Sequence, residues 1–498
     1  MRTAGQNKFF IFLSVFFLVP RVARIVYPYV WLEDPYYLYA AALIKQGILP
    51  FRDFGHTQLP GTEYLLAFFY SLFGNSYVVA EIISQVVIYL NTWLIFLIGK
   101  KLCNQTVGVL AALIFSCSSL LFRYHVWERE VLVVFLLTLT FYLFVRWERL
   151  NFKRTVVLSI LLTLGITIKL TTVVPVMAIL FFTIFARKER ANTLILAALI
   201  FVFSCLAIFL IVRISPENAF NQAFLYHFVK GATFASSIDM LLFPRYVLDL
   251  PLALGICGVL FWEKKLFPDF WFPIFLALSE WTFYSFISPN VWPHNYIPSL
   301  LLLSLSGGIF IFTVWELFWR ERKVIMPCLS ILALVLMLIF VCPIKNLNWT
   351  MGSTYGFGYI PRRDINQISK FIQSNTTSND LLLVPQYIAA EAGRKSVISD
   401  RIEATGVFRW IEERRTEDHE ITEIIEMSKG KSFSQMQSET LSMGWGKINV
   451  LLKKNRIKYL VPDIVPGEKI PFSPKYLSSL GYIPVKKIGL YVIWTPRH

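Results

Sequence analysis

The sequence has few charged residues. Only 16% of its 498 residues are Asp, Glu, Lys or Arg, whereas 56% are hydrophobic. In soluble globular proteins about a quarter of the residues are charged. Here the hydrophobic residues gather in long apolar runs, and a helix of about 20 apolar residues is what a bilayer core requires. This arrangement excludes a soluble enzyme and predicts a polytopic α-helical membrane protein.

Motifs for metals and nucleotides are also lacking. The six cysteines show no C-x-x-C or other metal-ligand spacing, so neither a zinc site nor a disulfide framework is indicated. No G-x-G-x-x-G or P-loop pattern is present, and nothing therefore points to a nucleotide ligand. Acidic residues are outnumbered 32 to 48 by basic ones. Because cytoplasmic loops of membrane proteins collect Lys and Arg, this excess does not indicate nucleic acid, and we expect no nucleic-acid partner.

The apolar runs predict about eleven transmembrane spans. They fall at about 9–30, 82–99, 107–122, 130–145, 155–169, 171–186, 193–212, 246–262, 270–288, 296–318 and 324–342. The stretch from 155 to 186 is too long for one span, and we divide it at Lys169. The first run is not followed by a small-residue cleavage site, so we interpret it as a retained span.

Basic residues indicate the orientation of these spans. Every even-numbered span ends on a basic loop, for example at Lys100 and Lys101. This pattern predicts a cytoplasmic N-terminus and an extracytoplasmic C-terminus. We therefore expect a transmembrane catalytic domain over residues 1–343 and a soluble extracytoplasmic domain over residues 344–498.

The soluble tail has the pattern of a small α/β layer. An amphipathic helix is expected over 362–373 and a charged helix over 411–427. Short apolar segments at 381–385, 458–462 and 491–495 read as buried strands. Strands separated by helical stretches are typical of an α/β arrangement.

The first outer loop is the most informative segment. Pro35 can occupy the first turn of a helix with Asp34 as its N-cap, and that helix ends at Gly47. A second helix follows and ends at Gly74. Both are too short to span, so we expect them to lie in the membrane interface, where their aromatic residues fit. Asp34 is either a helix cap or a catalytic base, and Glu33 either a solvated neighbour or the base itself.

The motifs of this loop resemble a known superfamily. They are acidic-Asp-x-x-Tyr-x-Tyr-Ala over 33–40, Gly-x-x-Pro-Phe-Arg-Asp-Phe over 47–54, Gln-x-Pro-Gly over 58–61 and Leu-Phe-Gly over 72–74. This pattern is similar to the GT-C superfamily of integral-membrane glycosyltransferases. The most similar branches are the bacterial ones related to protein O-mannosyltransferases and to the aminoarabinose transferase of lipid A. Many members have Asp-Glu where this chain has Glu33-Asp34, so the identity of the base stays open, although the spacing to Tyr37 and Ala40 favours Asp34.

The resemblance implies an enzyme of the bacterial plasma (inner) membrane. It would transfer a sugar from a polyprenyl-phosphate carrier to a lipid, glycan or protein acceptor on the outer face, with inversion at the anomeric carbon. A first-loop carboxylate would deprotonate the acceptor hydroxyl. Asp53 matches a second acidic position that shapes the site, and its alternative role is a salt bridge with Arg52. No metal is expected to be obligatory, although a divalent ion at Asp34 and Asp53 is an alternative.

Several further residues are candidates for binding the donor. Lys169 lies in an apolar run, where a charged side chain is a functional hypothesis by default, the alternative being a side chain that snorkels to the interface. Arg245 is a second phosphate candidate or an interface anchor. Glu128 or Glu130 either orients Lys169 or a sugar, or forms a loop ion pair.

The segment WPHNY at 292–296 adds two aromatic candidates. His294 would bind phosphate or a sugar hydroxyl, and Trp292 would stack on the sugar or line the lipid tail. The alternative is an aromatic belt with a capping histidine. A transporter or flippase of lipid-linked saccharides is the rival function, because it also explains many spans and a buried lysine. Transporters often show repeated halves and midplane polar groups. The polar residues here concentrate on one face, without a repeat, which favours the transferase.

Overall fold

The structure is a computed structural model of the whole chain. It describes residues 34–116, 127–226 (apart from 148 and 186–187), 271–284, 297–320, 362–397, 444–461 and 472–497 (apart from 490), with isolated residues 118, 121, 229, 255, 423 and 427. The chain forms two compact units. The first contains residues 1–26, 82–208 and 235–350, and the second contains residues 27–81, 209–234 and 351–498.

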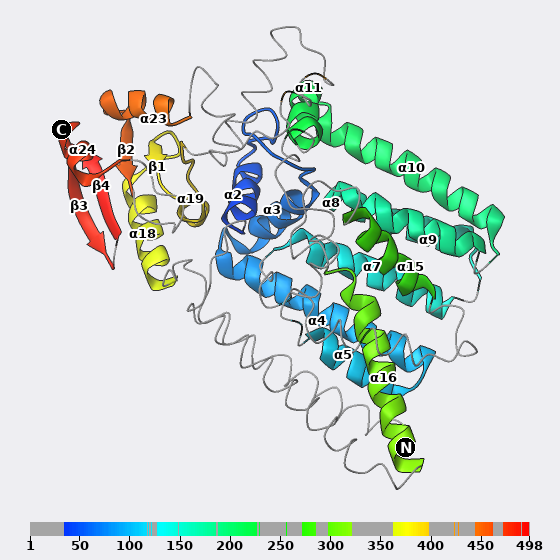
Figure 1. The fold of residues 1–498 in the computed structure, drawn as a ribbon. Coiled ribbons are helices and arrows are strands. Elements are labelled where there is room, and N and C mark those ends of the chain that lie inside the picture. The colour runs from blue at the N-terminus through cyan, green and yellow to red at the C-terminus, as the bar shows by residue number, and fades with distance from the viewer. Residues whose placement is uncertain are drawn as a thin grey trace. The chain divides into compact units, whose positions relative to one another are not determined.

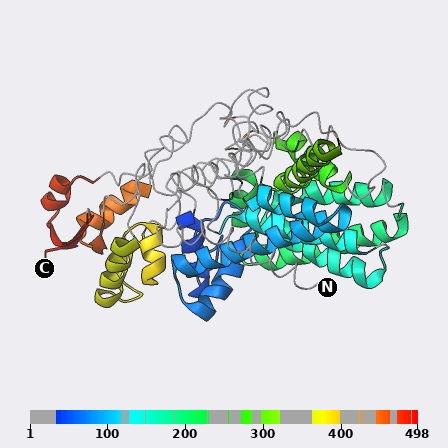
Figure 2. The same ribbon diagram turned by 90° about the horizontal axis from the view of Figure 1, so that it is seen from below.

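The first unit is built from long apolar helices (Figure 1). They are α4 (Tyr77–Leu102, whose first turn belongs to the second unit), α5 (Gln105–Ser116), α7 (Arg129–Arg146), α8 (Phe152–Ile168), α9 (Val173–Phe185), α10 (Arg190–Val212, whose last turn belongs to the second unit), α15 (Trp271–Thr282) and α16 (Leu300–Arg320). Helix α5 packs on α16, α7 on α8, and α9 on α15, and both views show these helices running alongside one another (Figures 1 and 2).

Eight of the predicted spans coincide with these helices. The division at Lys169 is confirmed, because α8 ends at Ile168 and the short 3-10 helix η1 (Leu170–Thr172) separates it from α9. The predicted spans at 9–30, 246–262 and 324–342 lie outside the described residues.

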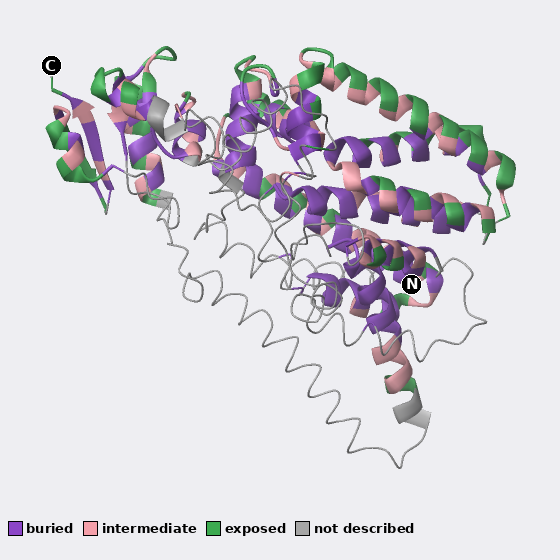
Figure 3. Ribbon diagram, turned by 45° about the horizontal axis from the view of Figure 1, so that its top comes forward, coloured by how far each residue is buried: buried purple, intermediate pink, exposed green. Residues whose placement is uncertain are grey.

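Within the described part of the chain, two helices are long and apolar enough to cross a membrane by length and composition, α4 and α10. Helix α10 exposes large apolar side chains along its length, among them Leu194 and Phe201, each 69% exposed (Figure 3). Exposed apolar area of this extent is unusual on a soluble surface. It fits the predicted membrane location.

Glycines allow very close helix packing in the first unit. A Cβ atom added to Gly108 of α5 would lie 2.4 Å from the Phe96 carbonyl oxygen and 2.8 Å from the Lys100 nitrogen of α4. These are backbone atoms, so no side-chain rotation can relieve the clash. The contact between α4 and α5 therefore depends on the absence of a side chain at position 108.

In the second unit, the helices of the first outer loop end where the sequence predicts. Helix α2 (Asp34–Lys45) stops before Gly47, which has a φ of +79°. Helix α3 (Gly61–Phe73) stops at Gly74, with a φ of +87° and an N–H that donates to the Tyr70 carbonyl. A positive φ favours glycine, which has no Cβ to clash. Glycine therefore ends both helices.

The two helices differ in their surroundings. Residues 36–43 of α2 are buried, none more than 5% exposed, whereas α3 exposes Leu65, Phe68, Leu72 and Phe73 (Figure 3). The predicted location in the membrane interface therefore fits α3, which presents an apolar stripe. For α2 the interfacial location stays a prediction, because its aromatic residues are covered by α3 and by the tail helix α19 (Gln386–Ala392).

The tail contains a mixed four-stranded sheet. Its strands β1 (Leu381–Leu383), β2 (Ile457–Leu460), β3 (Tyr482–Ile488) and β4 (Tyr491–Pro496) have the order β1-β2-β4-β3. Strands β1 and β2 are parallel and the other pairs antiparallel. The associated helices are α18 (Arg362–Asn375), α19, α23 (Gly444–Lys453) and α24 (Pro474–Ser479) (Figure 1). The three predicted strands and the first predicted helix are confirmed. The helix expected over 411–427 lies outside the described residues except for positions 423 and 427.

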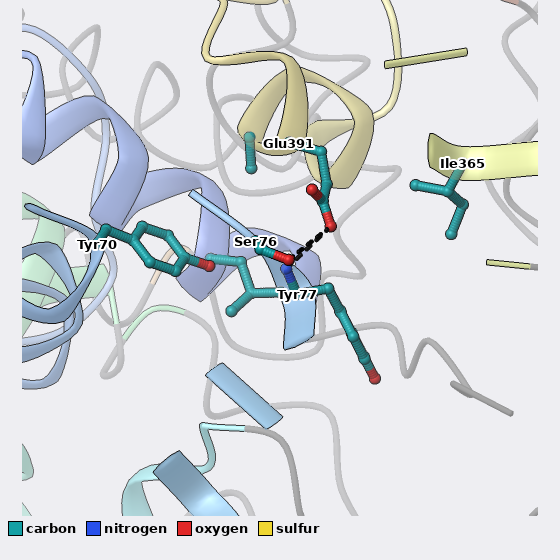
Figure 4. A pocket seen from close by; sticks show the side chains of 7 residues that line it. Tyr70, Ser76, Tyr77, Ile365 and Glu391 are labelled. Carbon is teal, nitrogen blue, oxygen red and sulfur yellow. Dashed lines mark hydrogen bonds between the residues drawn. The ribbon is translucent and has the colours of Figure 1, made fainter. Parts of the chain in front are cut away.

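The tail and the first outer loop are fastened together within the second unit. The Tyr39 hydroxyl accepts a hydrogen bond from the Ser396 N–H at 2.8 Å, and both residues are buried. Glu391 of α19 accepts from the Tyr77 N–H at 3.0 Å and from the Ser76 hydroxyl at 3.4 Å (Figure 4). A tail carboxylate therefore caps the N-terminus of α4, where a negative charge is favourable.

Candidate functional site

The motif Arg-Asp-Phe at 52–54 lies on a tight turn between α2 and α3. The Phe51 N–H donates to the Phe54 carbonyl, and the Asp53 N–H donates to the Leu49 carbonyl, both at 2.9 Å. Phe51 has a φ of +66°, a conformation that non-glycine residues seldom adopt. Such backbone conformations persist only where the surrounding structure holds them.

Asp53 forms the salt bridge that the sequence offered as an alternative role. Its two carboxylate oxygens accept from Arg52 Nε and Nη2 at 2.9 and 2.8 Å, and Oδ2 also accepts from the Leu49 N–H at 2.8 Å. The Arg52 guanidinium and, to a smaller extent, the Leu49 N–H hold the pKa of Asp53 below its usual range. A carboxylate with a lowered pKa is a weak base. The geometry therefore favours a structural part for Asp53 in the turn.

Asp34 is the first residue of α2, so the structure places its backbone at the helix N-terminus, and its side chain is not among the described ones. Glu33, Arg245, Trp292 and His294 lie outside the described residues. The roles predicted for these residues stay predictions.

A buried histidine and glutamate form the core of the first outer loop. His56 Nε2 lies 3.3 Å from Glu63 Oε1, and both side chains are 0% exposed. The Tyr36 ring stacks on the imidazole with a centroid distance of 5.3 Å. Both residues belong to the first outer loop, but they are seven positions apart and lie on opposite sides of a turn. No sequence motif therefore predicted that they would pair.

A second outer segment covers this loop. Helix α11 (Pro216–Phe220) and the π-helical segment η2 (Asn221–Leu225) follow α10. Gln222 Oε1 accepts from the His56 N–H at 2.9 Å, and Asn218 Nδ2 donates to the Phe51 carbonyl at 3.1 Å. The side-chain amides of Gln222 and Asn218 therefore bind backbone groups of the turn and stabilise its conformation.

The first unit contains a separate polar cluster around Lys169. The lysine stands at the break between α8 and η1, and its Nζ binds Glu130 Oε1, with side chains that are 12% and 4% exposed. Nζ also lies 5.8 Å from the centre of the Tyr284 ring. The Tyr284 hydroxyl lies 3.3 Å from Thr171 Oγ1, and these residues line a small cavity together with Glu280. The lysine is therefore held by protein groups and does not reach out to solvent.

Two members of this cluster were not predicted. Glu280 and Tyr284 lie in the apolar run 270–288, and Glu280 is 4% exposed, accepting from the Ser299 hydroxyl at 3.4 Å. A carboxylate in the middle of an apolar run is the signal that could have found it.

Of the two acidic candidates Glu128 and Glu130, it is Glu130 that forms the ion pair with Lys169. Glu128, the other candidate, is the buried residue directly before α7. Among the described residues, no group of three or more His, Cys, Asp or Glu side chains could hold a metal ion.

Comparisons with known proteins agree with this architecture. The family profile described as "Dolichyl-phosphate-mannose-protein mannosyltransferase" matches residues 56–236, which is about a third of the chain. No curated protein sequence matches the chain. Among solved structures, ArnT from Cupriavidus metallidurans bound to undecaprenyl phosphate matches with a TM-score of 0.62 and 12% identity, covering 99% of this chain and 98% of that one.

Two larger proteins share the fold over part of their length. The archaeal oligosaccharyltransferase AglB from Archaeoglobus fulgidus, in complex with an inhibitory peptide and a dolichol-phosphate, matches with a TM-score of 0.52 and 12% identity, covering 90% of this chain and 69% of that one. The mycobacterial arabinofuranosyltransferase AftD matches with a TM-score of 0.53 and 12% identity over 98% of this chain and 40% of that one. The chain therefore shares its fold with ArnT, over nearly the whole length of both chains, and with parts of AglB and AftD.

Proposed function

We propose that the protein is an inverting glycosyltransferase of the bacterial plasma membrane. It transfers a sugar from a polyprenyl-phosphate-linked donor to a hydroxyl of a lipid, glycan or protein acceptor on the outer face. The observation that carries the proposal is the likeness, over almost the whole of both chains, to an ArnT with undecaprenyl phosphate bound. The first-loop motifs around Asp34 and the buried Lys169 support it from the sequence side.

In this proposal Asp34 is the general base. It takes the proton of the acceptor hydroxyl while the acceptor oxygen forms a bond to the anomeric carbon. The bond from that carbon to the phosphate oxygen breaks, and its electron pair leaves with polyprenyl phosphate. Asp53 is the weaker candidate, because its carboxylate is engaged by Arg52 and the Leu49 N–H.

Lys169 is the group proposed to neutralise the donor phosphate. Charge-assisted hydrogen bonds from a lysine to phosphate are among the strong ones. Glu130 holds the ammonium group in place in the free protein, and the phosphate competes with this carboxylate when the donor binds. Because a cationic side chain supplies the neutralising charge, we propose that no metal is obligatory. Chelation with EDTA, followed by addition of Mg²⁺ or Mn²⁺, tests that point.

The test is sugar transfer by the purified full-length protein in nanodiscs. Radiolabelled polyprenyl-phosphate sugars are offered with a membrane extract as the acceptor source, and wild type is compared with Asp34→Asn, Glu33→Gln, Asp53→Asn and Lys169→Met. We expect label to reach a new product, with Asp34→Asn lowering the rate by at least about 10²-fold, the scale of general-base catalysis. Circular dichroism and gel filtration serve as controls for folding.

Other results redirect the assignment. If Glu33→Gln abolishes transfer and Asp34→Asn does not, the base is Glu33. If wild type transfers no sugar but moves labelled lipid across sealed vesicles, the protein is a transporter and the proposed function is wrong.

A further inference from the structure

The buried pair of His56 and Glu63 has no part in the reaction as proposed above. His56 Nδ1 lies 2.7 Å from the Gln58 carbonyl oxygen. A carbonyl oxygen only accepts, so Nδ1 carries the hydrogen in this contact. The same nitrogen is 3.4 Å from the Gln58 N–H, a longer contact that would require the other tautomer. The shorter contact decides, and Nε2 is the nitrogen that faces Glu63.

The facing atoms of the two side chains lie close together. His56 Nε2 is 3.3 Å from Glu63 Oε1, and neither side chain is exposed. Buried polar groups depend on their polar neighbours, so removing one side chain changes the surroundings of the other. We therefore expect the two residues to act as one unit.

The pair joins the turn to the helix that begins at Asp34. The Tyr36 ring, two positions after Asp34, stacks on the imidazole at an interplanar angle of 30°, and the Tyr36 hydroxyl donates to the Gly55 carbonyl at 3.0 Å. From the other side Gln222 of η2 binds the His56 backbone N–H. His56 is thus where α2, α3 and the second outer segment meet.

We propose that His56 and Glu63 are positioning residues, which fix the turn at 50–56 against the first turn of α2 and so fix the backbone at Asp34. This inference rests on the proposed function, because it assigns the pair a part in that reaction. The proposed reaction assigns neither side chain a contact with the reacting groups. Their effect passes through Tyr36, whose ring and hydroxyl are both bound to the turn.

The first experiment measures transfer kinetics of His56→Gln, Glu63→Gln and the double variant. We expect each single substitution to lower kcat about tenfold or more, with the KM for the polyprenyl-phosphate sugar within about twofold of wild type. Residues that act as one unit show non-additive effects, so the double variant is expected to be no slower than the slower single one. Ser71→Ala is the matched control, because its hydroxyl on α3 bonds only to the same helix at Ala67 in the contacts described.

The second experiment is independent of activity. Trypsin can cut after Arg52, whose side chain is 50% exposed, when the turn opens. We expect cleavage at this bond, followed by mass spectrometry, to be at least about fivefold faster in both single variants than in wild type and in Ser71→Ala.

The outcomes separate the two proposals. Unchanged kcat and unchanged cleavage in both single variants overturn the inference. A kcat that falls only with the folded fraction, at unchanged cleavage, also overturns it, because the pair is then merely structural. If wild type transfers no sugar but cleavage responds to the substitutions, the anchoring of the turn is supported and the proposed function is what fails.

Discussion

Removal of the tail carboxylate that caps α4 gives a sharp test of how the second unit is held together. In the Glu391→Ala variant, the Tyr77 N–H at the start of α4 loses its acceptor, and the Ser76 hydroxyl loses its contact with the same oxygen (Figure 4). A side-chain cap stabilises a helix start by about 1 kcal/mol, and a carboxylate near the positive end of the helix dipole adds about 0.3–1 kcal/mol. The first turn of α4 should therefore be destabilised by about 1–2 kcal/mol.

Amide hydrogen exchange measures this loss directly. Since 1.4 kcal/mol corresponds to a factor of ten, the variant should exchange the Tyr77 amide about 5- to 30-fold faster than wild type. Glu391→Gln keeps an oxygen acceptor and loses only the charge, so we expect about a 2- to 5-fold effect. Peptides from the β3–β4 hairpin are the internal reference and should not change.

The reasoning is refuted if the Tyr77 amide exchanges at the wild-type rate in Glu391→Ala while the thermal stability is also unchanged. Faster exchange across the whole tail would have another meaning. It would show that α19 no longer packs on α2, and that Glu391 stabilises the packing of the tail as well as the first turn of α4.

Three further predictions concern other parts of the chain. Lys169→Met should lower the stability in detergent by about 3–5 kcal/mol, because the ion pair of Glu130 with Lys169 is lost in a buried place. The additional substitution Glu130→Gln should restore most of the lost stability. An equal loss of stability in the double variant, measured by thermal unfolding, would contradict this prediction. Gly108→Ala should cost about 1–3 kcal/mol through overlap with backbone atoms of α4, and unchanged thermal unfolding of this variant would refute the packing argument. Gly74→Ala, where a Cβ meets nothing within 4 Å, should cost about 1–3 kcal/mol through its backbone conformation alone, with a φ of 87° and a ψ of 159°. Because the pKa of Asp53 is lowered, its ion pair with Arg52 stabilises the turn above about pH 4 and is lost only as the pH falls through that lowered pKa. The fall of the transfer rate at acidic pH should therefore persist in Asp53→Asn. If this fall disappears in the variant, Asp53 is the group that causes it.

Features with a local cause could be predicted from the sequence. The ends of α2 and α3 follow from Gly47 and Gly74, which adopt positive φ values. The break between α8 and α9 follows from a lysine within an apolar run. In each case the few residues around the feature contain the whole physical reason.

Features that depend on distant partners could not be predicted. The edge strand β3 has the exposed residues Pro484, Lys486 and Lys487 between its ends, so no apolar alternation marks it. The burial of α2 depends on Tyr39 meeting Ser396, 357 positions further along the chain. A single sequence contains no signal for such a pairing, and an aromatic helix next to a membrane span reads equally well as interfacial.

The hydrogen bonds between Tyr39 and Ser396 also decide how this protein can be recombined with its relatives. A chimera that exchanges only the tail keeps the α2 surface of one parent and receives the α19 surface of the other. The Tyr39 hydroxyl would then have to bond to the backbone of the other parent's tail. The cap at the start of α4 would depend on the residue that replaced Glu391. Grafts that transfer residues 34–81 together with the tail preserve these contacts, because both segments belong to one compact unit. The natural module for exchange is therefore discontinuous in sequence.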